Sequence, residues 1–168
     1  MAGMKLDDTD RRILANLQAD GRMTNVELAR RVGISAPPCL RRVRTLEQAG
    51  YIRGYHAQVN GELLGFSVTV YALVGLKGQS ETDLRAFEER CAAWPLVREC
   101  TMLQGENDFV LNVVAQNLEA YNHFLTHELT AAPNVAHVKS SLVIRTSKAE
   151  PGVPFAVALI SPAKGRKK

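Results

Sequence analysis

The chain has 168 residues, of which 46% are hydrophobic, so it can form one domain or two small ones with apolar cores. No apolar run approaches the roughly 20 residues that span a bilayer, and the first residues lack the apolar core of a signal peptide. The three cysteines are widely spaced and form no CxxC pair, which argues against a disulfide framework or a zinc finger. We therefore expect a cytoplasmic protein with reduced thiols.

Charge divides the sequence into three parts. Residues 1–60 hold ten Lys and Arg against six Asp and Glu, residues 61–160 hold seven against eleven, and residues 161–168 add four positive charges. Because Lys and Arg displace the counterions condensed on DNA, only the two basic ends are expected to meet a polyanion. We predict a DNA-binding domain over 1–60, a second domain over 61–150, and an extension over 151–168 with a basic, disordered tail.

The first 50 residues carry the pattern of three helices. The first, over residues 6–18, has acidic residues in its first turn. The second is predicted to begin with a capping box of Thr24 and Glu27 and to end at Gly33, after which Ser35 caps the third. Two short helices joined by a glycine turn, the second rich in arginine, have the layout of a DNA-binding helix-turn-helix.

The outward face of the third helix is the candidate DNA-reading surface. At about 100° per residue, the inward face is predicted to hold Leu40, Val43 and Leu46. On the outward face, Arg41 is expected to contact guanine, and Pro38 and Thr45 to contact thymine methyl groups. Phosphates are the expected partners of Arg42, Arg44 and Asn25. The full set of expected DNA contacts is Asn25, Ser35, Ala36, Pro38, Arg41, Arg42, Arg44 and Thr45. A solvated surface helix or a two-helix protein interaction module is the alternative interpretation.

The remainder of the chain alternates between strand and helix patterns. Residues 50–59 predict a small wing or a connecting strand. Later elements are expected as a strand over 66–76, a helix over 80–93, strands over 97–103 and 109–115, a helix over 118–129, and a strand over 135–144. This βαββαβ order predicts an α+β, ferredoxin-like sandwich with both helices on one face of one sheet.

The other face of that sheet is expected to be bare. We assign to it a set of apolar strand residues, namely Val68, Val70, Leu111, Val113 and Val143. Because such a face needs a cover, we expect at least a homodimer.

Motifs along nearly the whole chain resemble one known family. They are Leu6-Asp7-x-x-Asp10-Arg11-x-Ile13-Leu14, Leu17-Gln18-x-Asp20-Gly21-Arg22, Asn25-Val26-Glu27-Leu28-Ala29, Val32-Gly33-Ile34-Ser35, Cys39-Leu40-Arg41-Arg42-Val43-x-x-Leu46-Glu47, Gly105-x-x-Asp108-Phe109 and Ala132-Pro133-x-Val135. The sequence thus resembles the Lrp/AsnC, or feast/famine, regulators of transcription in prokaryotes. The resemblance implies a winged helix-turn-helix, a RAM-type ligand-binding sandwich, double-stranded DNA and a small amino acid as partners, nucleoid association, and dimers that often assemble into octamers.

The same resemblance implies an effector pocket between subunits, lined by the loop before residue 109. The implied residues are Leu103, Gly105, Glu106, Asn107, Asp108, Ser140 and Ser141. A glycine turn can present amide hydrogens to a carboxylate, and Asp108 can pair with an ammonium group, which together suit a zwitterionic amino acid. Asn107 stands where relatives often carry an aromatic residue, which leaves the side-chain preference of the pocket open.

Other chemistries have little support in the sequence. His123 and His127 are spaced i, i+4, but no third ligand accompanies them, so we expect surface histidines and no metal. Cys39 is expected to pack in the core. No nucleophile with a base, Walker loop or Rossmann fingerprint is present, which predicts a protein that is not an enzyme and needs no cofactor. The strands lack the aromatic platforms of RNA-binding sheets. An effector-independent architectural DNA-binding protein is the alternative function, and the basic tail is either a solvated end or a phosphate contact.

Overall fold

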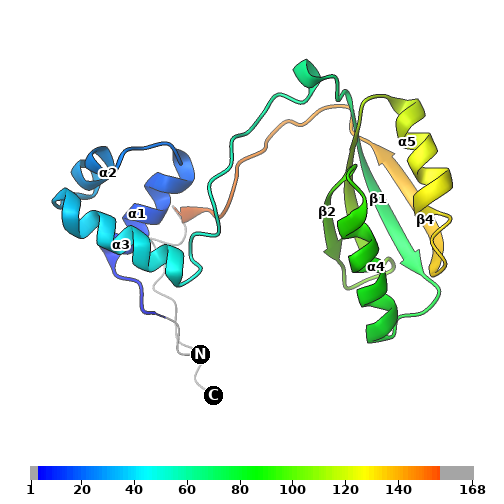
Figure 1. Cartoon of the computed structure of the whole chain (residues 1–168), viewed down its shortest axis with the longest axis horizontal. Coiled ribbons are helices and arrows are strands. Elements are labelled where there is room, and N and C mark those ends of the chain that lie inside the picture. Colours follow the sequence, from blue (N-terminus) through cyan, green and yellow to red (C-terminus); the bar gives the residue numbers. More distant parts are fainter. Residues whose placement is uncertain (1–3, 156–168) are drawn as a thin grey trace. The chain divides into compact units, whose positions relative to one another are not determined.

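The computed structural model describes residues 4–155, which divide into two compact units (Figure 1). Of the described residues, the first unit contains 4–58 and 148–155, and the second contains Val59–Ser147. Most of the basic tail predicted over 151–168 lies outside the described residues. The segment from Lys148 to Phe155 returns to the first unit, although it follows the last strand of the second.

The first unit contains three helices around one small apolar core. They are α1 (Asp8–Ala19), α2 (Asn25–Val32) and α3 (Ala36–Gln48). Their buried side chains are Ile13, Leu14, Leu28, Ala29, Val32, Cys39 and Leu46. The packing of Cys39 is therefore confirmed. All of residues 51–60 are described, and none of them belongs to a strand, so the expected wing or connecting strand is an irregular segment here.

The reciprocal capping box lies at α1 and not at α2. The Asp10 amide donates to the Asp7 carboxylate at 2.8 Å, and the Asp7 amide donates to the Asp10 carboxylate at 3.1 Å. At α2, Thr24 Oγ1 accepts from the Glu27 amide at 3.3 Å, as predicted. The Glu27 carboxylate, however, accepts from the side chains of Arg30 and Arg31, so the return half of the predicted box is missing.

The start of α3 also differs from the prediction, for a reason that lies in the sequence. Gly33 ends α2 with a φ of 76°, as expected. Ser35 occupies the position before α3, but its side chain makes no capping hydrogen bond. A capping side chain accepts from the second or third amide of the helix, and these residues are Pro37 and Pro38, which have no N–H.

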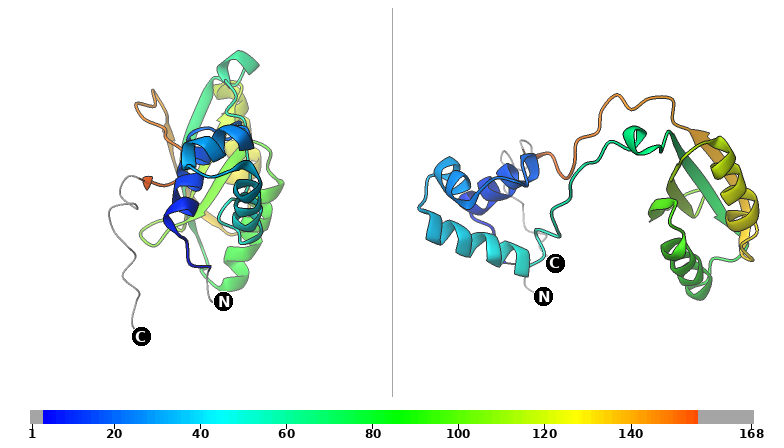
Figure 2. Two further views of the ribbon diagram at one scale, coloured as in Figure 1. Left: turned by 90° about the vertical axis from the view of Figure 1, so that its left-hand side faces the viewer. Right: turned by 45° about the horizontal axis from the view of Figure 1, so that its top comes forward.

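The second unit has the predicted βαββαβ order. A short 3₁₀ turn, Glu62–Leu64, is followed by β1 (Val68–Leu76), α4 (Glu81–Ala93), β2 (Val97–Met102), β3 (Phe109–Ala115), α5 (Leu118–Phe124) with a π-helical turn (Leu125–Leu129), and β4 (Val135–Leu142). The strands form one antiparallel sheet in the order β2-β3-β1-β4. Both helices pack on one face of it (Figure 1, Figure 2).

The sequence assigned most of the bare-face residues to the wrong side. Val70, Leu111 and Val113 are at most 1% exposed and pack under the helices, and Val68 packs against the same cluster. Only Val143, which bonds to Thr69 beyond the end of β4, lies on the uncovered side. The error arose because β3 is apolar in both alternating phases, so the sequence does not show which phase faces the helices.

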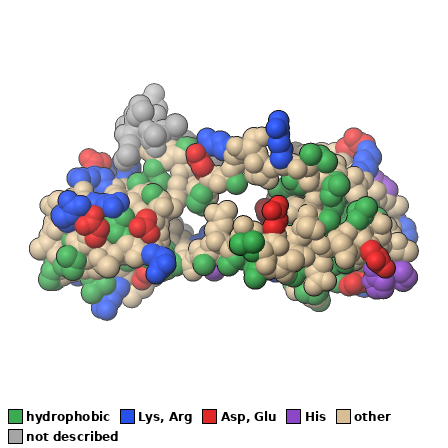
Figure 3. Space-filling model, turned by 90° about the horizontal axis from the view of Figure 1, so that it is seen from above, with side chains coloured by type: hydrophobic (Ala, Val, Ile, Leu, Met, Phe, Trp, Pro, Cys, Tyr) green, Lys and Arg blue, Asp and Glu red, His purple; other side chains and the backbone are tan. Residues whose placement is uncertain are grey.

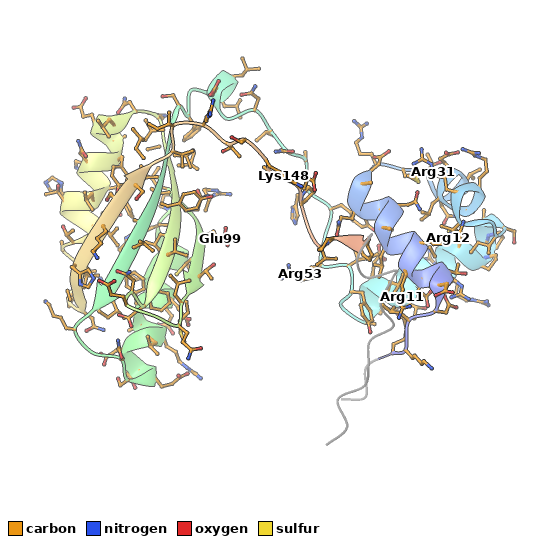
Figure 4. The ribbon with its side chains drawn as sticks, turned by 180° about the vertical axis from the view of Figure 1, so that it is seen from behind. Arg11, Arg12, Arg31, Arg53, Glu99 and Lys148 are labelled. Carbon is orange, nitrogen blue, oxygen red and sulfur yellow. The ribbon has the colours of Figure 1, made fainter. Side chains whose placement is uncertain are left out.

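We call the uncovered side the open face. By strand register its residues are Thr69, Tyr71, Leu73, Gly75, Glu99, Thr101, Val110, Asn112, Val114, His137, Lys139, Ser141 and Val143. Figure 4 views the sheet from this side, with Glu99 labelled on β2. The open face mixes apolar and polar side chains, and Tyr71 at its centre is 46% exposed.

Two Leu→Ala changes can test which side of β3 faces the helices. Leu111 is fully buried, whereas Leu118 is 52% exposed. Leu111→Ala should lower the free energy of unfolding of the second unit by about 2–5 kcal/mol, because it leaves a cavity under the helices. Leu118→Ala should change it by less than about 0.5 kcal/mol. The one tryptophan, Trp94, is packed in this core and reports urea unfolding of this unit by fluorescence; equal effects of the two changes would contradict the observed phase.

Candidate functional site

The outward face of α3 carries two arginines that are available to a ligand. Cys39 and Leu46 are fully buried on the inward face, and Arg41 and Arg44 are exposed on the opposite side. Neither arginine forms an ion pair with any residue that the structure describes. Leu40, which was predicted to face inward, is 39% exposed, because it lies about 100° around the helix from Cys39, at the edge of the packed face.

The other predicted contacts on α3 are arranged around Arg41. The Thr45 hydroxyl donates to the Arg41 carbonyl at 2.9 Å, one turn earlier. This bond directs the hydroxyl to the backbone, so the methyl group is the part of Thr45 left for an apolar contact. Ser35 is exposed, and Ala36 and Pro38 are half-buried. These three residues lie at the amino end of the helix, on its solvent side or at its edge.

Arg42, for which a phosphate contact is predicted, makes two ion pairs within the three-helix unit. Its Nη1 donates to Asp10 at 2.7 Å and to Asp7 at 2.8 Å, which joins α3 to the start of α1. Asp10 is only 6% exposed. The hydrogen bonds that Arg42 donates to Asp10 and to Asp7 raise the pKa of Arg42, and the hydrogen bonds that Asp7 accepts from the Asp10 amide and from Arg42 lower the pKa of Asp7. Arg42 therefore holds the three-helix unit together.

Asn25 is likewise used inside the unit. Its Nδ2 donates to the Ala36 carbonyl at 2.8 Å, which fixes the start of α2 against the start of α3. Its Oδ1 is buried and has no partner among the described residues. The two residues after Ala36 are prolines and cannot donate to it. Asn25, for which a phosphate contact is predicted, thus links the two helices.

A second group of arginines lies on α1 and α2, where Figure 4 labels Arg11, Arg12 and Arg31. The Arg12 side chain donates to the Arg31 carbonyl at 2.9 Å. Hydrogen bonds from Arg30 and then Arg31 lower the pKa of Glu27 to about 2. Figure 3 shows Lys and Arg of this unit interspersed with Asp and Glu. Much of this charge is therefore paired, in contrast to Arg41 and Arg44.

The loop between β2 and β3 is fastened to the end of β1 by Asp108. One carboxylate oxygen accepts from the Leu76 amide at 2.7 Å, and the other accepts from Gln79 Nε2 at 2.8 Å. The Asp108 carbonyl accepts from the Leu103 amide at 2.7 Å. Asp108 thus shapes the loop, whereas the sequence assigned its carboxylate to an ammonium group.

The same loop is linked to β4 by two side-chain pairs that sequence reasoning missed. Lys139 donates to Glu106 at 3.1 Å, and His137 Nε2 lies 3.3 Å from Asn107 Oδ1. A Cβ atom on Gly75 would lie 2.1 Å from the His137 ring, so glycine leaves the space that this ring occupies. No local motif marks His137 and Lys139, because only the strand register places them beside the loop.

Ser140 and Ser141 lie on opposite faces of the sheet. The Ser140 hydroxyl hydrogen-bonds with the Tyr121 hydroxyl on the side of the helices. Ser141 is paired with Tyr71 on the open face, which also carries His137 and Lys139. Successive residues of a strand alternate in this way, so a single pocket on the open face includes Ser141 and excludes Ser140.

The remaining chemistry-bearing residues form no further centre. The rings of His123 and His127 stack at 4.4 Å, and among the described residues no three His, Cys, Asp or Glu are placed to hold a metal ion. The cysteines are unpaired thiols, and burial raises the pKa of Cys39. Within residues 4–155, no helix has the length and apolar character needed to cross a membrane.

Comparison with known proteins decides the family. The sequence pattern of winged helix-turn-helix DNA-binding domains matches residues 6–53, and that of the Lrp/AsnC ligand binding domain matches residues 69–153. The chain belongs to the Lrp/AsnC family. It is a DNA-binding transcriptional regulator with a ligand-binding domain, and the family consists of regulators and not of enzymes. The predicted family, fold class and type of function are confirmed.

Three relatives illustrate the match to this Lrp/AsnC regulator. The leucine-responsive regulatory protein of Rhizobium meliloti is 56% identical over 86% of this chain and 93% of its own. The Bkd operon transcriptional regulator of Pseudomonas aeruginosa is 42% identical over 84% of this chain and 93% of its own. A transcriptional regulator of Neisseria meningitidis, solved in complex with L-Met, superposes with a TM-score of 0.86 at 34% identity, over 92% of this chain and 99% of that chain.

The two neighbouring arginines of α3 should respond differently to removal. Arg42→Ala should lower the free energy of unfolding of the three-helix unit by about 1–3 kcal/mol, because Asp10 stays buried without its partner. Arg41→Ala should leave the melting temperature unchanged and reduce discrimination between an operator and a mismatched site by about 1–3 kcal/mol. Circular dichroism melting and competitive gel shifts measure the two effects. If both variants changed the same property, the division of roles would be wrong.

Proposed function

We propose that this regulator binds a pseudo-palindromic operator as a dimer, and that a small amino acid bound beside the loop of residues 103–108 changes its assembly or its DNA binding. The observation that carries the proposal is the collection of opposite charges at one edge of the open face. Lys139 on β4 lies 3.1 Å from Glu106, which is on the loop that Asp108 holds in place. Association with the nucleoid follows from the DNA binding.

The dimer is supported by the character of the open face. Leu73, Val110 and Val114 form a partly exposed apolar strip next to Tyr71. A second copy of the same face provides matching apolar area, and a two-fold interface pairs each surface patch with itself. Such a dimer presents two α3 helices, which suits an operator with two half-sites. The family resemblance extends this unit to a tetramer of dimers.

The effector site is supported by the requirements of a zwitterion. An amino acid needs an acceptor for its ammonium group and a donor for its carboxylate. Glu106 supplies the first and Lys139 the second, while the amides of the loop around Gly105 add donors. Asn107 and His137, joined at 3.3 Å, are next to this pair and are placed to contact the effector side chain. The complex of the Neisseria regulator with L-Met shows such a ligand in a relative.

The DNA-reading role of α3 is supported by its two unpaired arginines. Arg41 is the proposed guanine contact, with the methyl group of Thr45 and the ring of Pro38 beside it for thymine. Arg44 follows Arg41 by three residues, which is nearly one helical turn along the outward face, and suits a phosphate. Ser35 and Ala36 lie at the amino end of the helix, where the protein backbone and the DNA backbone come close in the proposed complex. Arg42 and Asn25 are not part of this proposed surface.

The dimer predicts the effect of a charge on the open face. Val110→Arg should convert the protein to monomers, because it places two cations against each other across a two-fold interface. The Trp94 fluorescence should stay native, since Val110 is outside the helix-covered core. Light scattering after size-exclusion chromatography measures the mass. A wild-type protein that is already monomeric, or a variant that stays dimeric, would rule out this interface.

The effector site predicts a selective response to amino acids. In a thermal-shift panel of the twenty amino acids, we expect one chemical class to raise the melting temperature, because a ligand that binds only the folded state stabilises it. Lys139→Gln should abolish this shift and leave DNA binding intact. Arg85→Gln removes an exposed cation on α4 that is also paired with a glutamate, and serves as the control. A panel without any shift would favour the effector-independent architectural protein.

A further inference from the structure

Two of the three cysteines lie on facing elements of the second unit. Cys91 is on α4, where it is 3% exposed, and Cys100 is half-buried on β2. Cys100 is directly opposite Leu111, a residue of the helix-covered side, so its side chain is also directed toward the helices. Both cysteines pack in the same apolar cluster. Cys39, in contrast, lies in the core of the other unit.

The positions of the two cysteines along α4 and β2 coincide. The rings of Phe87 and Phe109 pack with their centroids 4.9 Å apart, and Phe109 is opposite Met102 on β2. Cys91 follows Phe87 by four helical residues, and Cys100 precedes Met102 by two strand residues, and both steps cover about 6–7 Å. The steps lead in the same direction, because α4 connects two strands that point the same way and so runs back along the sheet (Figure 1). Cys91 therefore lies over Cys100.

The two thiols interact directly. The hydrogen bond between them, with Cys91 as the donor, raises the pKa of Cys91 and lowers the pKa of Cys100. Burial adds to the first effect, whereas burial and the Glu88 carboxylate oppose the second without reversing it. The thiolate is the nucleophilic form of cysteine, so Cys100 is the more reactive member of the pair.

The place of β2 in the sheet gives the two cysteines different access to solvent. β2 is an edge strand, next to β3 alone, and Cys100 on it is partly exposed. Cys91 is covered, on the side of α4 that faces the sheet. An accessible thiol next to a second thiol is the arrangement in which one cysteine is oxidised first and the other then forms a disulfide with it.

We propose that Cys91 and Cys100 are an oxidation-sensitive pair, which a peroxide converts to a disulfide between α4 and β2 of one chain. The Cys100 thiolate attacks one oxygen of hydrogen peroxide, the O–O bond breaks, and hydroxide leaves as Cys100 becomes a sulfenic acid. The Cys91 sulfur then attacks the Cys100 sulfur and forms the S–S bond, while the sulfenic oxygen leaves as water with the Cys91 proton. In total, two thiols and one hydrogen peroxide give one disulfide and two waters.

The disulfide would fasten the strand that leads into the loop of residues 103–108, because β2 ends at Met102. It lies on the helix-covered side of the sheet and involves no residue of the open face. The proposal therefore depends neither on the proposed effector nor on the proposed dimer.

The test is peptide mapping of the full chain after treatment with a stoichiometric amount of hydrogen peroxide. Trypsin cleaves after Arg90 and Arg98, so Cys91 is in peptide 91–98 and Cys100 is in peptide 99–139. Without reductant, we expect these two peptides joined, with a mass lower than their sum by two hydrogen atoms, and dithiothreitol should separate them. The thiols that titrate in denaturant should fall from three per chain to one. Three remaining thiols, a joined peptide with Cys39, or a covalent dimer on a non-reducing gel would overturn the proposal.

Three variants separate the roles of the cysteines. Cys100→Ala should leave Cys91 reduced under the same treatment, because Cys91 is buried. Cys91→Ala should leave Cys100 as a sulfenic acid, which dimedone traps. Cys39→Ala removes a buried thiol from the other unit and is the matched control, in which the joined peptide should form as in the wild type. Circular dichroism checks each fold, and the half-buried Cys100→Ala decides alone if Cys91→Ala does not fold. Oxidation of Cys91 at the wild-type rate in Cys100→Ala would overturn the assignment of Cys100 as the first to react.

Discussion

One sheet with both helices on the same side is the constraint on which the rest of the second unit depends. The helices bury one phase of each strand, so every other residue of β1, β3 and β4 is left on the open face. In the proposed assembly, that face supplies both the surface for a second copy and the side chains beside the loop of residues 103–108. The proposed dimer and the proposed effector site are therefore adjacent for a reason of topology, and a ligand at this edge can alter how two copies fit.

The first unit divides its arginines between structure and binding. Arg42 is tied to Asp7 and the buried Asp10, and Arg30 and Arg31 are paired with Glu27. These contacts fix the three short helices, whose core contains few large side chains. Arg41 and Arg44 stay unpaired among the described residues and give the outward face of α3 its net positive charge. The net charge of the unit alone would not have shown this division.

The sequence was informative where the physical cause is local. Gly33 and the order of strands and helices could be predicted, because turns, caps and hydrophobic periods depend on neighbouring residues. Features that depend on how the strands are aligned in the folded sheet, or on distant partners, could not be predicted. The apolar pattern of β3 hides which side is buried, and nothing near His137 or Lys139 in the chain indicates that they meet the loop. The partners that Arg42 and Asn25 have within the unit could not be predicted, because they are distant in the sequence or are backbone atoms.

The pair Pro37 and Pro38 at the amino end of α3 has a consequence for how this protein meets its operator. A helix start is normally a ready binding place for a phosphate, because its first amides point outward. Two of those amides are absent here, so in the proposed complex with DNA the tip of α3 offers a phosphate fewer backbone donors, and side chains take a larger share of that contact. In that proposed complex, the depth and tilt of α3 in the groove depend more on side chains, which substitution can change without disturbing the backbone. Operator preference in such a regulator can shift in evolution by single side-chain replacements while the scaffold stays constant.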